Sequence, residues 1–164
     1  MPRTPGEVAE STDVDAVTDA VLSASRLLVA VSARSIAAVD EAITLAQFRL
    51  LVILNAVGAT KHAALADQLG VNPSTASRMV DRLVAAGMVV RETNPASRRE
   101  IVIELTAEGR RVVRQVTARR RKEIAKIVAR MPESARVGLV DALLAFTDAG
   151  GESAITVAPD SAWS

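Results

Sequence analysis

Apolar positions at the start of the chain recur at the three- and four-residue spacing of an α-helix. One such stripe comprises Val14, Val17, Val21, Ala24, Leu28, Val31 and Ser35. This spacing predicts one long amphipathic helix that begins at Thr12 or Asp13 and runs to about Val39. Asp15 then falls in its first turn, where the helix dipole favours acids. The polar residues 1–12 before it are expected to form a flexible leader.

Two helices are predicted next, each bounded by a cap residue and a glycine. The segment LAQFRLLVILNAV is apolar on nearly every side, so it is expected to be a buried helix between Thr44 and Gly58. The segment KHAALADQLG follows, with Thr60 as its expected N-cap and Gly70 at its end. Its inward side is expected to consist of Leu65, Ala66 and Leu69.

The segment VNPSTASRMVDRLVAAG predicts a fourth helix directly after a short connection. Asn72 or Ser74 is a suitable N-cap, and Pro73 lies at or beside the first helical position, where its missing N–H has no consequence. Gly87 is expected to close this helix. The inward stripe is predicted to be Ala76, Val80, Leu83 and Val84.

The pattern then changes from helical spacing to that of β-strands. MVVRET and REIVIEL are rich in β-branched residues, and the second run alternates apolar and charged positions. The polar NPAS between them predicts a hairpin loop. Thr106 opens another helix, which Pro132 stops, and the segment PESARVGLVDALLAFTDAGG predicts one last amphipathic helix before a tail.

Two short helices with a tight connection, followed by a β-hairpin, are typical of a winged helix-turn-helix. The predicted fold is therefore mainly α, with a small β-hairpin wing. We expect a leader at 1–12, an N-terminal dimerisation helix at 13–43 and a winged helix-turn-helix DNA-binding domain at 44–106. C-terminal dimerisation helices at 107–149 and a tail at 150–164 complete the predicted organisation.

The formal net charge is +1, but the charged residues are distributed unevenly along the chain. Residues 1–20 carry one basic and five acidic residues, whereas residues 73–130 carry fourteen basic and six acidic residues. A basic middle segment indicates either a polyanionic partner or a series of solvated helix faces, and charge alone does not separate these. The run Arg119–Lys122 is interpreted as a solvated face or as a set of inter-helix salt bridges.

Composition excludes several classes of function. The chain has no cysteine and one histidine, so disulfides, thiolate chemistry and a cysteine-based zinc site are ruled out. His62 is expected to be an exposed helix residue, and no metal or other cofactor is predicted. Neither a phosphate-binding loop nor a plausible nucleophile with a base is present, so an enzyme is not expected. The longest uncharged stretch has eleven residues, too few to span a bilayer, which favours a cytoplasmic protein without membrane contact.

The candidate DNA-contacting residues lie on the outer face of the fourth helix and on the hairpin. Small hydroxyl side chains at a helix N-terminus allow close approach to phosphates and base edges, and an arginine on a slender hairpin can enter a minor groove. Arg78 and Arg82 lie one turn apart on the same face of the helix. The predicted contacts are Ser74, Thr75, Ser77, Arg78, Arg82, Arg98 and Arg99.

The segments LADQLGVNPSTASRMVDRLVAAGMVVR and SRREIVIELTAEG resemble the MarR family of transcriptional regulators over roughly residues 25–130. The resemblance implies a homodimer held by interdigitating terminal helices. Its two winged domains would contact successive major grooves of a pseudopalindromic double-stranded DNA site, most often to repress transcription. Many members release DNA when a small phenolic or other anionic ligand binds between the dimerisation and DNA-binding regions. Phe48 is interpreted as a core residue, with the lining of such a pocket as the alternative.

The wing departs from the family pattern Asp-Pro-x-Asp-x-Arg. Here the sequence is Asn94-Pro95-Ala96-Ser97-Arg98-Arg99, so Arg99 matches the wing-tip arginine while both acids are absent. Without the acid at Ser97, Arg99 is expected to be held less rigidly. The altered wing and the tail also support a second hypothesis, a helical dimer that acts mainly as a protein-interaction module.

Overall fold

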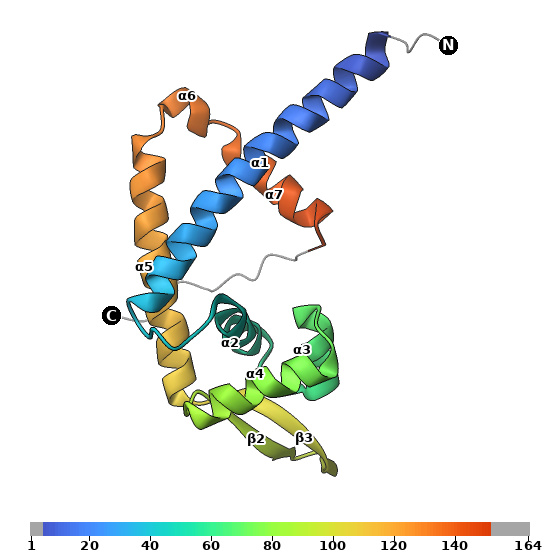
Figure 1. Cartoon of the computed structure of the whole chain (residues 1–164), viewed down its shortest axis with the longest axis vertical. Coiled ribbons are helices and arrows are strands. Elements are labelled where there is room, and N and C mark those ends of the chain that lie inside the picture. Colours follow the sequence, from blue (N-terminus) through green and yellow to red (C-terminus); the bar gives the residue numbers. More distant parts are fainter. Residues whose placement is uncertain (1–4, 152–164) are drawn as a thin grey trace.

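The computed structural model describes residues 5–151, with side chains from residue 13 onward. The predicted leader and tail therefore lie outside the described residues at 1–4 and 152–164. Figure 1 shows α1 projecting beyond the rest of the molecule at one end and the β-hairpin at the other. The elements are α1 (Pro5–Ala37), α2 (Leu45–Val57), β1 (Thr60–Lys61), α3 (His62–Leu69), α4 (Pro73–Ala85), β2 (Val89–Asn94), β3 (Ser97–Leu105), α5 (Ala107–Arg130), α6 (Glu133–Arg136) and α7 (Leu139–Ala149).

The first helix is longer than the spacing of apolar residues predicted. It begins at Pro5 rather than at Thr12 or Asp13, so the predicted leader is wrong for residues 5–12. Proline is well tolerated at the first position of a helix, because its missing N–H would have no intrahelical partner there. The helix end at Ala37 lies close to the predicted end at Val39.

The core of the molecule forms around α2, as its nearly all-round apolar character predicted. Thr44 and Gln47 form a reciprocal capping box, in which each backbone N–H donates to the side chain of the other residue, at 3.0 and 3.2 Å. Gly58 ends the helix with φ of 77°. Leu50 and Leu51 of α2 are buried against residues of α3, α4, β3 and α5, which include Leu65, Val80, Leu83, Ile103, Val112 and Val116.

The predicted hairpin is confirmed as β2 and β3, and β1 adds a third strand, which gives an antiparallel sheet in the order β1-β3-β2. β1 is a two-residue strand that pairs Thr60 with Ile103 and Lys61 with Val102. The prediction that Thr60 caps α3 is therefore wrong. Thr60 is buried, its hydroxyl donates to the Gly58 carbonyl at 2.8 Å, and Lys61 takes the cap position without a side-chain hydrogen bond.

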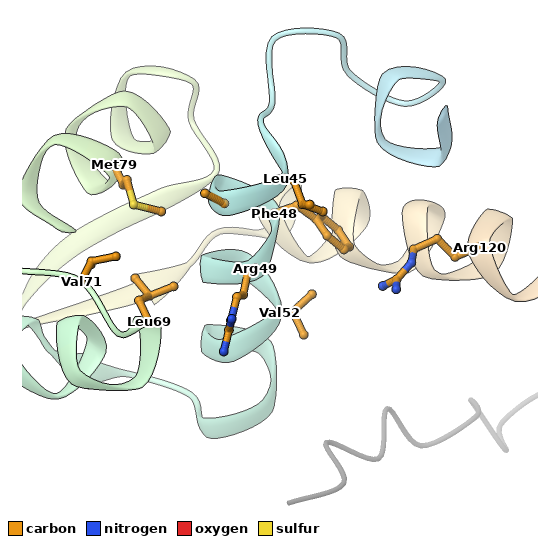
Figure 2. Close-up of a pocket in the computed structure, with 9 residues that line it drawn as sticks. Leu45, Phe48, Arg49, Val52, Leu69, Val71, Met79 and Arg120 are labelled. Atoms are coloured by element: carbon orange, nitrogen blue, oxygen red, sulfur yellow. The ribbon is translucent and has the colours of Figure 1, made fainter. Parts of the chain in front are cut away.

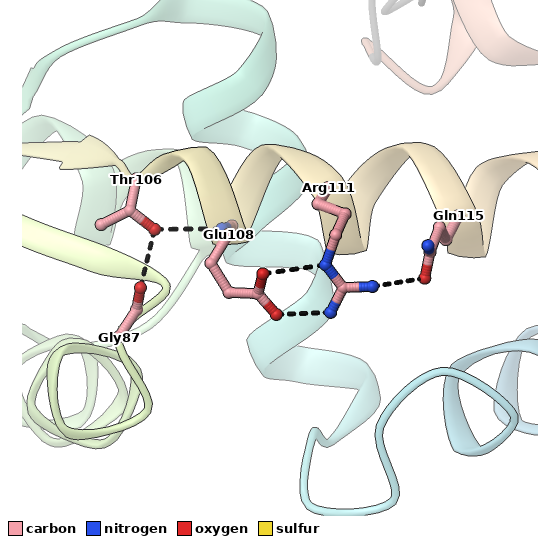
Figure 3. A network of polar contacts seen from close by, with 6 residues as sticks. Gly87, Thr106, Glu108, Arg111 and Gln115 are labelled. Carbon is pink, nitrogen blue, oxygen red and sulfur yellow. Dashed lines mark hydrogen bonds and ion pairs between the residues drawn. The ribbon is translucent and has the colours of Figure 1, made fainter.

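The base of the wing is tied to the start of α5 by the hydrogen bonds in Figure 3. The Thr106 hydroxyl donates to the Gly87 carbonyl at 2.7 Å and accepts from the Gly109 backbone N–H at 3.0 Å. Along the first turns of α5, Arg111 donates to both Glu108 and Gln115. One threonine thus serves as the N-cap of α5 and as the link to the turn after α4.

The predicted last helix is two helices. α6 ends at Arg136, and α7 begins at Leu139 after Gly138, whose φ of 75° lies in the left-handed region that glycine adopts without strain. A helix cannot continue through a residue in that conformation, so the segment bends there. The apolar spacing across residues 132–150 did not reveal this break.

Large apolar side chains remain exposed on α1 and α7. Those on α7 are Val140, Leu143, Leu144 and Phe146, with Val137 two residues before the helix, and those on α1 include Val14, Val17, Leu22, Leu27, Leu28 and Val29. The part of α1 from Asp13 to Ala37 is also long and apolar enough, by length and composition alone, to cross a bilayer. Exposed apolar faces of this extent are typical of interaction surfaces.

Candidate nucleic-acid interface

A tight turn sets α4 against α3 with its N-terminus exposed. Gly70 ends α3 in the left-handed conformation, with φ of 67°. Asn72 caps α4, as one of the two predicted alternatives, because its side-chain oxygen accepts the Thr75 backbone N–H at 2.8 Å. Ala76, Val80 and Leu83 are buried on the inner side of α4. The helix therefore presents its opposite side to solvent.

The outer face of α4 brings together several of the predicted DNA contacts. The Ser74 hydroxyl donates to the Asn72 side chain at 2.8 Å, which leaves its oxygen lone pairs as its remaining hydrogen-bonding capacity. Arg78 is exposed, and its guanidinium donates to the Thr75 hydroxyl at 3.5 Å. Thr75 and Ser77 are half-buried. Ser74, Thr75 and Arg78 thus form one polar group at the start of the helix.

Arg82 lies apart from that group. It is exposed near the end of α4, where it lines a cavity of about 260 Å³ together with Asp40, Thr44 and Gln47. This cavity faces the connection between α1 and α2. The structure therefore does not bring Arg82 together with the polar group at the start of α4.

The wing tip is held by a different set of side chains from that of the family pattern. Asn94 accepts the Ala96 backbone N–H through its side-chain oxygen at 3.0 Å, and its amide donates to Glu100 at 2.9 Å. Lys61 Nζ donates to the other oxygen of Glu100 at 2.7 Å. Arg98 and Arg99 are exposed on the β3 side of the turn. Glu100 thus links the turn to β1 through Asn94 and Lys61.

A second ion pair joins the hairpin to α4. Arg91 on β2 donates to the carboxylate of Asp81 on the exposed side of the helix. The sequence pattern did not indicate this pair. The pair links the hairpin to the helix at a point where both side chains are solvent-exposed.

We expect Glu100→Gln to loosen the wing while leaving the fold intact. The Lys61 hydrogen bond, followed by that of Asn94, lowers the pKa of Glu100 below its ordinary value of 4.5. Because the folded-state pKa is the lower one, the brace is fully present above about pH 4.5 and is lost as pH falls through the lowered pKa. The variant should therefore show faster amide hydrogen exchange at Asn94–Glu100 at neutral pH, with an unchanged unfolding midpoint. Wild-type exchange rates at these amides would contradict the brace.

An apolar cavity of about 510 Å³ lies between α2, α4, the turn after α3 and α5 (Figure 2). Phe48 is buried, which confirms its interpretation as a core residue; it also lines this cavity, and a role in ligand binding stays a prediction. Arg120 reaches the cavity from α5, and its Nε is buried without a hydrogen-bond partner in the described part of the chain. The remaining lining residues are Leu45, Ala46, Arg49, Val52, Leu69, Val71 and Met79.

Sequence reasoning missed Arg120 because it treated Arg119–Lys122 as a single exposed run. Arg120 lies four residues after the buried Val116, one helical turn along the same face. Arg119 and Lys122 instead line a separate cavity against α1. His62 was also predicted incorrectly, because it is half-buried and its Nε2 has no hydrogen-bond partner among the described residues. Within residues 13–151, no group of three or more His, Asp or Glu side chains is placed to hold a metal ion.

The family model and curated proteins that match this chain carry the same family name. A family model described as MarR family matches residues 43–101. The multiple antibiotic resistance protein MarR of Escherichia coli (strain K12) is 36% identical over 67 residues, which is 41% of this chain and 46% of that protein. The match thus spans less than half the length of this curated relative. The corresponding protein of Salmonella typhimurium is 33% identical over the same length of chain.

Solved structures extend the likeness to most of the chain. The crystal structure of RV1404 from Mycobacterium tuberculosis is 58% identical, with a TM-score of 0.79 over 91% of this chain and 97% of that one. A MarR family protein from Bacillus stearothermophilus has a TM-score of 0.67 at 21% identity, covering 92% of this chain and 99% of that one. The latter shows a shared fold alone.

Proposed function

The chain belongs to the MarR family and has its winged helix-turn-helix fold, and on this premise we propose that it is a sequence-specific regulator of transcription. It binds double-stranded DNA as a homodimer, at a pseudopalindromic promoter site, and represses transcription. The observation that carries the proposal is the outer face of α4, where Ser74, Thr75 and Arg78 meet at an exposed helix N-terminus. The family and the fold are those of transcriptional regulators rather than enzymes.

The proposed contacts divide between two elements. Ser74, Thr75, Ser77 and Arg78 enter the major groove from α4, with Arg82 farther along the helix. Arg98 and Arg99 contact the adjacent minor groove or backbone from the wing. Support comes from the exposure of all four arginines and from the two braces that fix the wing, Asp81–Arg91 and Lys61–Glu100. A wing formed and held in this way favours DNA binding over the alternative of a protein-interaction module.

We expect Arg78→Ala to weaken binding to the specific site by about 1–3 kcal/mol if the guanidinium contacts a base, and by less if it contacts phosphate alone. The exposed fraction of Arg78 and its position beside Thr75 and Ser74 motivate the substitution. The measurement is a titration of specific and random duplexes with both proteins. Arg121→Ala provides the control, because Arg121 is equally basic and exposed but lies in the middle of α5.

The proposed function itself is tested by genome-wide capture of bound DNA followed by salt titration. Captured sites should be two-fold symmetric, with half-sites about 34–36 Å apart. Affinity should fall steeply with salt, with a slope of about −0.9 per neutralised phosphate. Affinity that is equal for captured and random duplexes, or that barely changes with salt, would support the protein-interaction module instead.

We also propose that the apolar cavity beside Phe48 takes a small-molecule effector that releases DNA. The buried Nε of Arg120 supplies a donor without a partner in the described chain, and the rest of the lining is largely apolar. An aromatic or aliphatic carboxylate fits that combination. Because the cavity touches both α5 and α4, a ligand there can shift the DNA-binding helix relative to the dimerisation helices. We place the protein in the cytoplasm, where the family normally acts, and assign the exposed apolar side of α1 to the dimer rather than to a membrane.

A further inference from the structure

Four basic side chains gather where the end of α1 meets the middle of α5. Arg34, Arg119, Lys122 and Lys126, here called the basic cluster, line a cavity of about 240 Å³ together with Ser35, Ala38 and Glu123. Glu123 is the one acid in this lining, and it accepts a hydrogen bond from Lys126 at 2.9 Å. Its pKa is lowered by Lys126 above all, and also by Arg34 and Lys122. One carboxylate leaves most of the positive charge of the cluster uncompensated.

The opposite charge lies on the projecting part of α1 (Figure 1). Asp13, Asp15 and Asp19, here called the acidic segment, are exposed and form no ion pair with any described residue. The helix dipole does not account for them, because α1 begins at Pro5 and the dipole effect fades after the first turn. Three carboxylates therefore stand on a helix whose apolar side is exposed as well.

We infer that the acidic segment of one protomer docks on the basic cluster of a second copy of this chain. Exposed Leu22, Leu27, Leu28 and Val29 lie between the two charged regions of α1. If two copies of α1 cross near Arg26, Asp19 and Arg34 lie about 11 Å from the crossing point, on opposite sides. An antiparallel crossing then brings the acidic segment of each copy to the α1 end that carries the partner's basic cluster. A parallel crossing would place like charges together, so the charge pattern selects the antiparallel one.

This inference rests on the proposed homodimer and adds to it the register and direction of the α1 pairing. The apolar side chains supply the surface area that is buried between the two α1 helices, whereas the charges decide between the parallel and the antiparallel alignment. Each exposed ion pair changes an association constant only by about 1.4- to 5-fold. Reversing three charges, at two symmetric contacts, is expected to weaken self-association by about tenfold or more.

Two charge-reversed full-length chains test the docking directly. The first carries Asp13→Lys, Asp15→Lys and Asp19→Lys, and the second carries Arg34→Glu, Arg119→Glu and Lys122→Glu. Each variant alone sets like charges against each other in its homodimer, so each should dissociate at concentrations where the wild type stays dimeric. Mixed together, they restore opposite charges at both contacts, and the heterodimer should form in preference to either homodimer. Sedimentation with differently labelled chains, at low and high salt, measures all three associations.

The matched control reverses three exposed acids elsewhere, Glu41→Lys, Asp67→Lys and Glu92→Lys, and should dimerise like the wild type. A monomeric wild type would refute the homodimer itself. A dimeric wild type with equally stable variant homodimers, or a statistical mixture of chains, would overturn the docking alone. The docking is also overturned by two results together. The mixed variants would form the heterodimer no more readily than the homodimers, and inorganic phosphate would raise the melting temperature of the wild type and of the first variant but not of the second. Those results would make the basic cluster an anion site.

Discussion

The double substitution Val140→Glu and Leu144→Glu is expected to convert the protein to a folded monomer that no longer binds its specific DNA site. The two residues lie one turn apart on α7, and 69% and 51% of their surfaces are exposed in the single chain. Because they are exposed there, the substitution should leave the fold of each protomer unchanged. In the proposed dimer these two positions are buried, so the substitution removes apolar contacts between the protomers and places charges in the interface.

The expected loss of dimer stability is large because two-fold symmetry makes each lost apolar contact occur twice in the interface. Burying a leucine or valine side chain contributes about 1.5–3 kcal/mol, and each of the two positions occurs twice in a symmetric interface. Sedimentation at micromolar concentration should show monomers, and affinity for a palindromic duplex should fall to that for a single half-site. Asn55→Glu adds one negative charge, half of that in the double variant, at an exposed position of α2 and serves as the control. A double variant that remains dimeric would remove this face of α7 from the interface.

The helix-turn-helix could be predicted from the sequence because its signals are local. Asn72 and Pro73 mark the start of α4, Gly70 marks the end of α3, and the spacing of Ala76, Val80 and Leu83 identifies the buried side. The hairpin was equally readable from its alternating residues. The candidate DNA contacts follow from the outer face of α4, and they stay predictions until they are measured.

What the sequence did not reveal depends on contacts between distant segments. Threonine often caps helices, yet Thr60 pairs with Ile103 on β3 and therefore lies in β1. Asp81 and Arg91 meet only because the hairpin folds back on α4. Glu100 meets Lys61, which lies 39 residues earlier in the chain. Such partners cannot be identified from local spacing.

Gly109 is another position whose importance depends on a distant segment. It lies at the start of α5, and a Cβ built there would be 2.2 Å from the Met88 backbone carbonyl oxygen and 3.0 Å from Leu105 Cδ2. The same carbonyl accepts the Thr106 backbone N–H at 3.0 Å, so it cannot move away without breaking the link between α4 and α5. Glycine is therefore required where α5 passes Met88, the residue that leads into β2.

Gly109→Ala is accordingly expected to lower the free energy of unfolding by about 1–3 kcal/mol, the usual result of overpacking a closely packed site. Alanine's higher helix propensity, worth up to about 1 kcal/mol, offsets only part of that loss. Because the strain falls on the Met88 and Thr106 backbone, the hairpin should shift and DNA affinity should fall together with stability. Gly150→Ala is the matched control: its Cβ would meet nothing closer than 3.5 Å, so the variant should be as stable as the wild type or slightly more so. Denaturant unfolding of the two variants, monitored by circular dichroism, separates them, and equal midpoints would show that α5 can move away from Met88 at little cost.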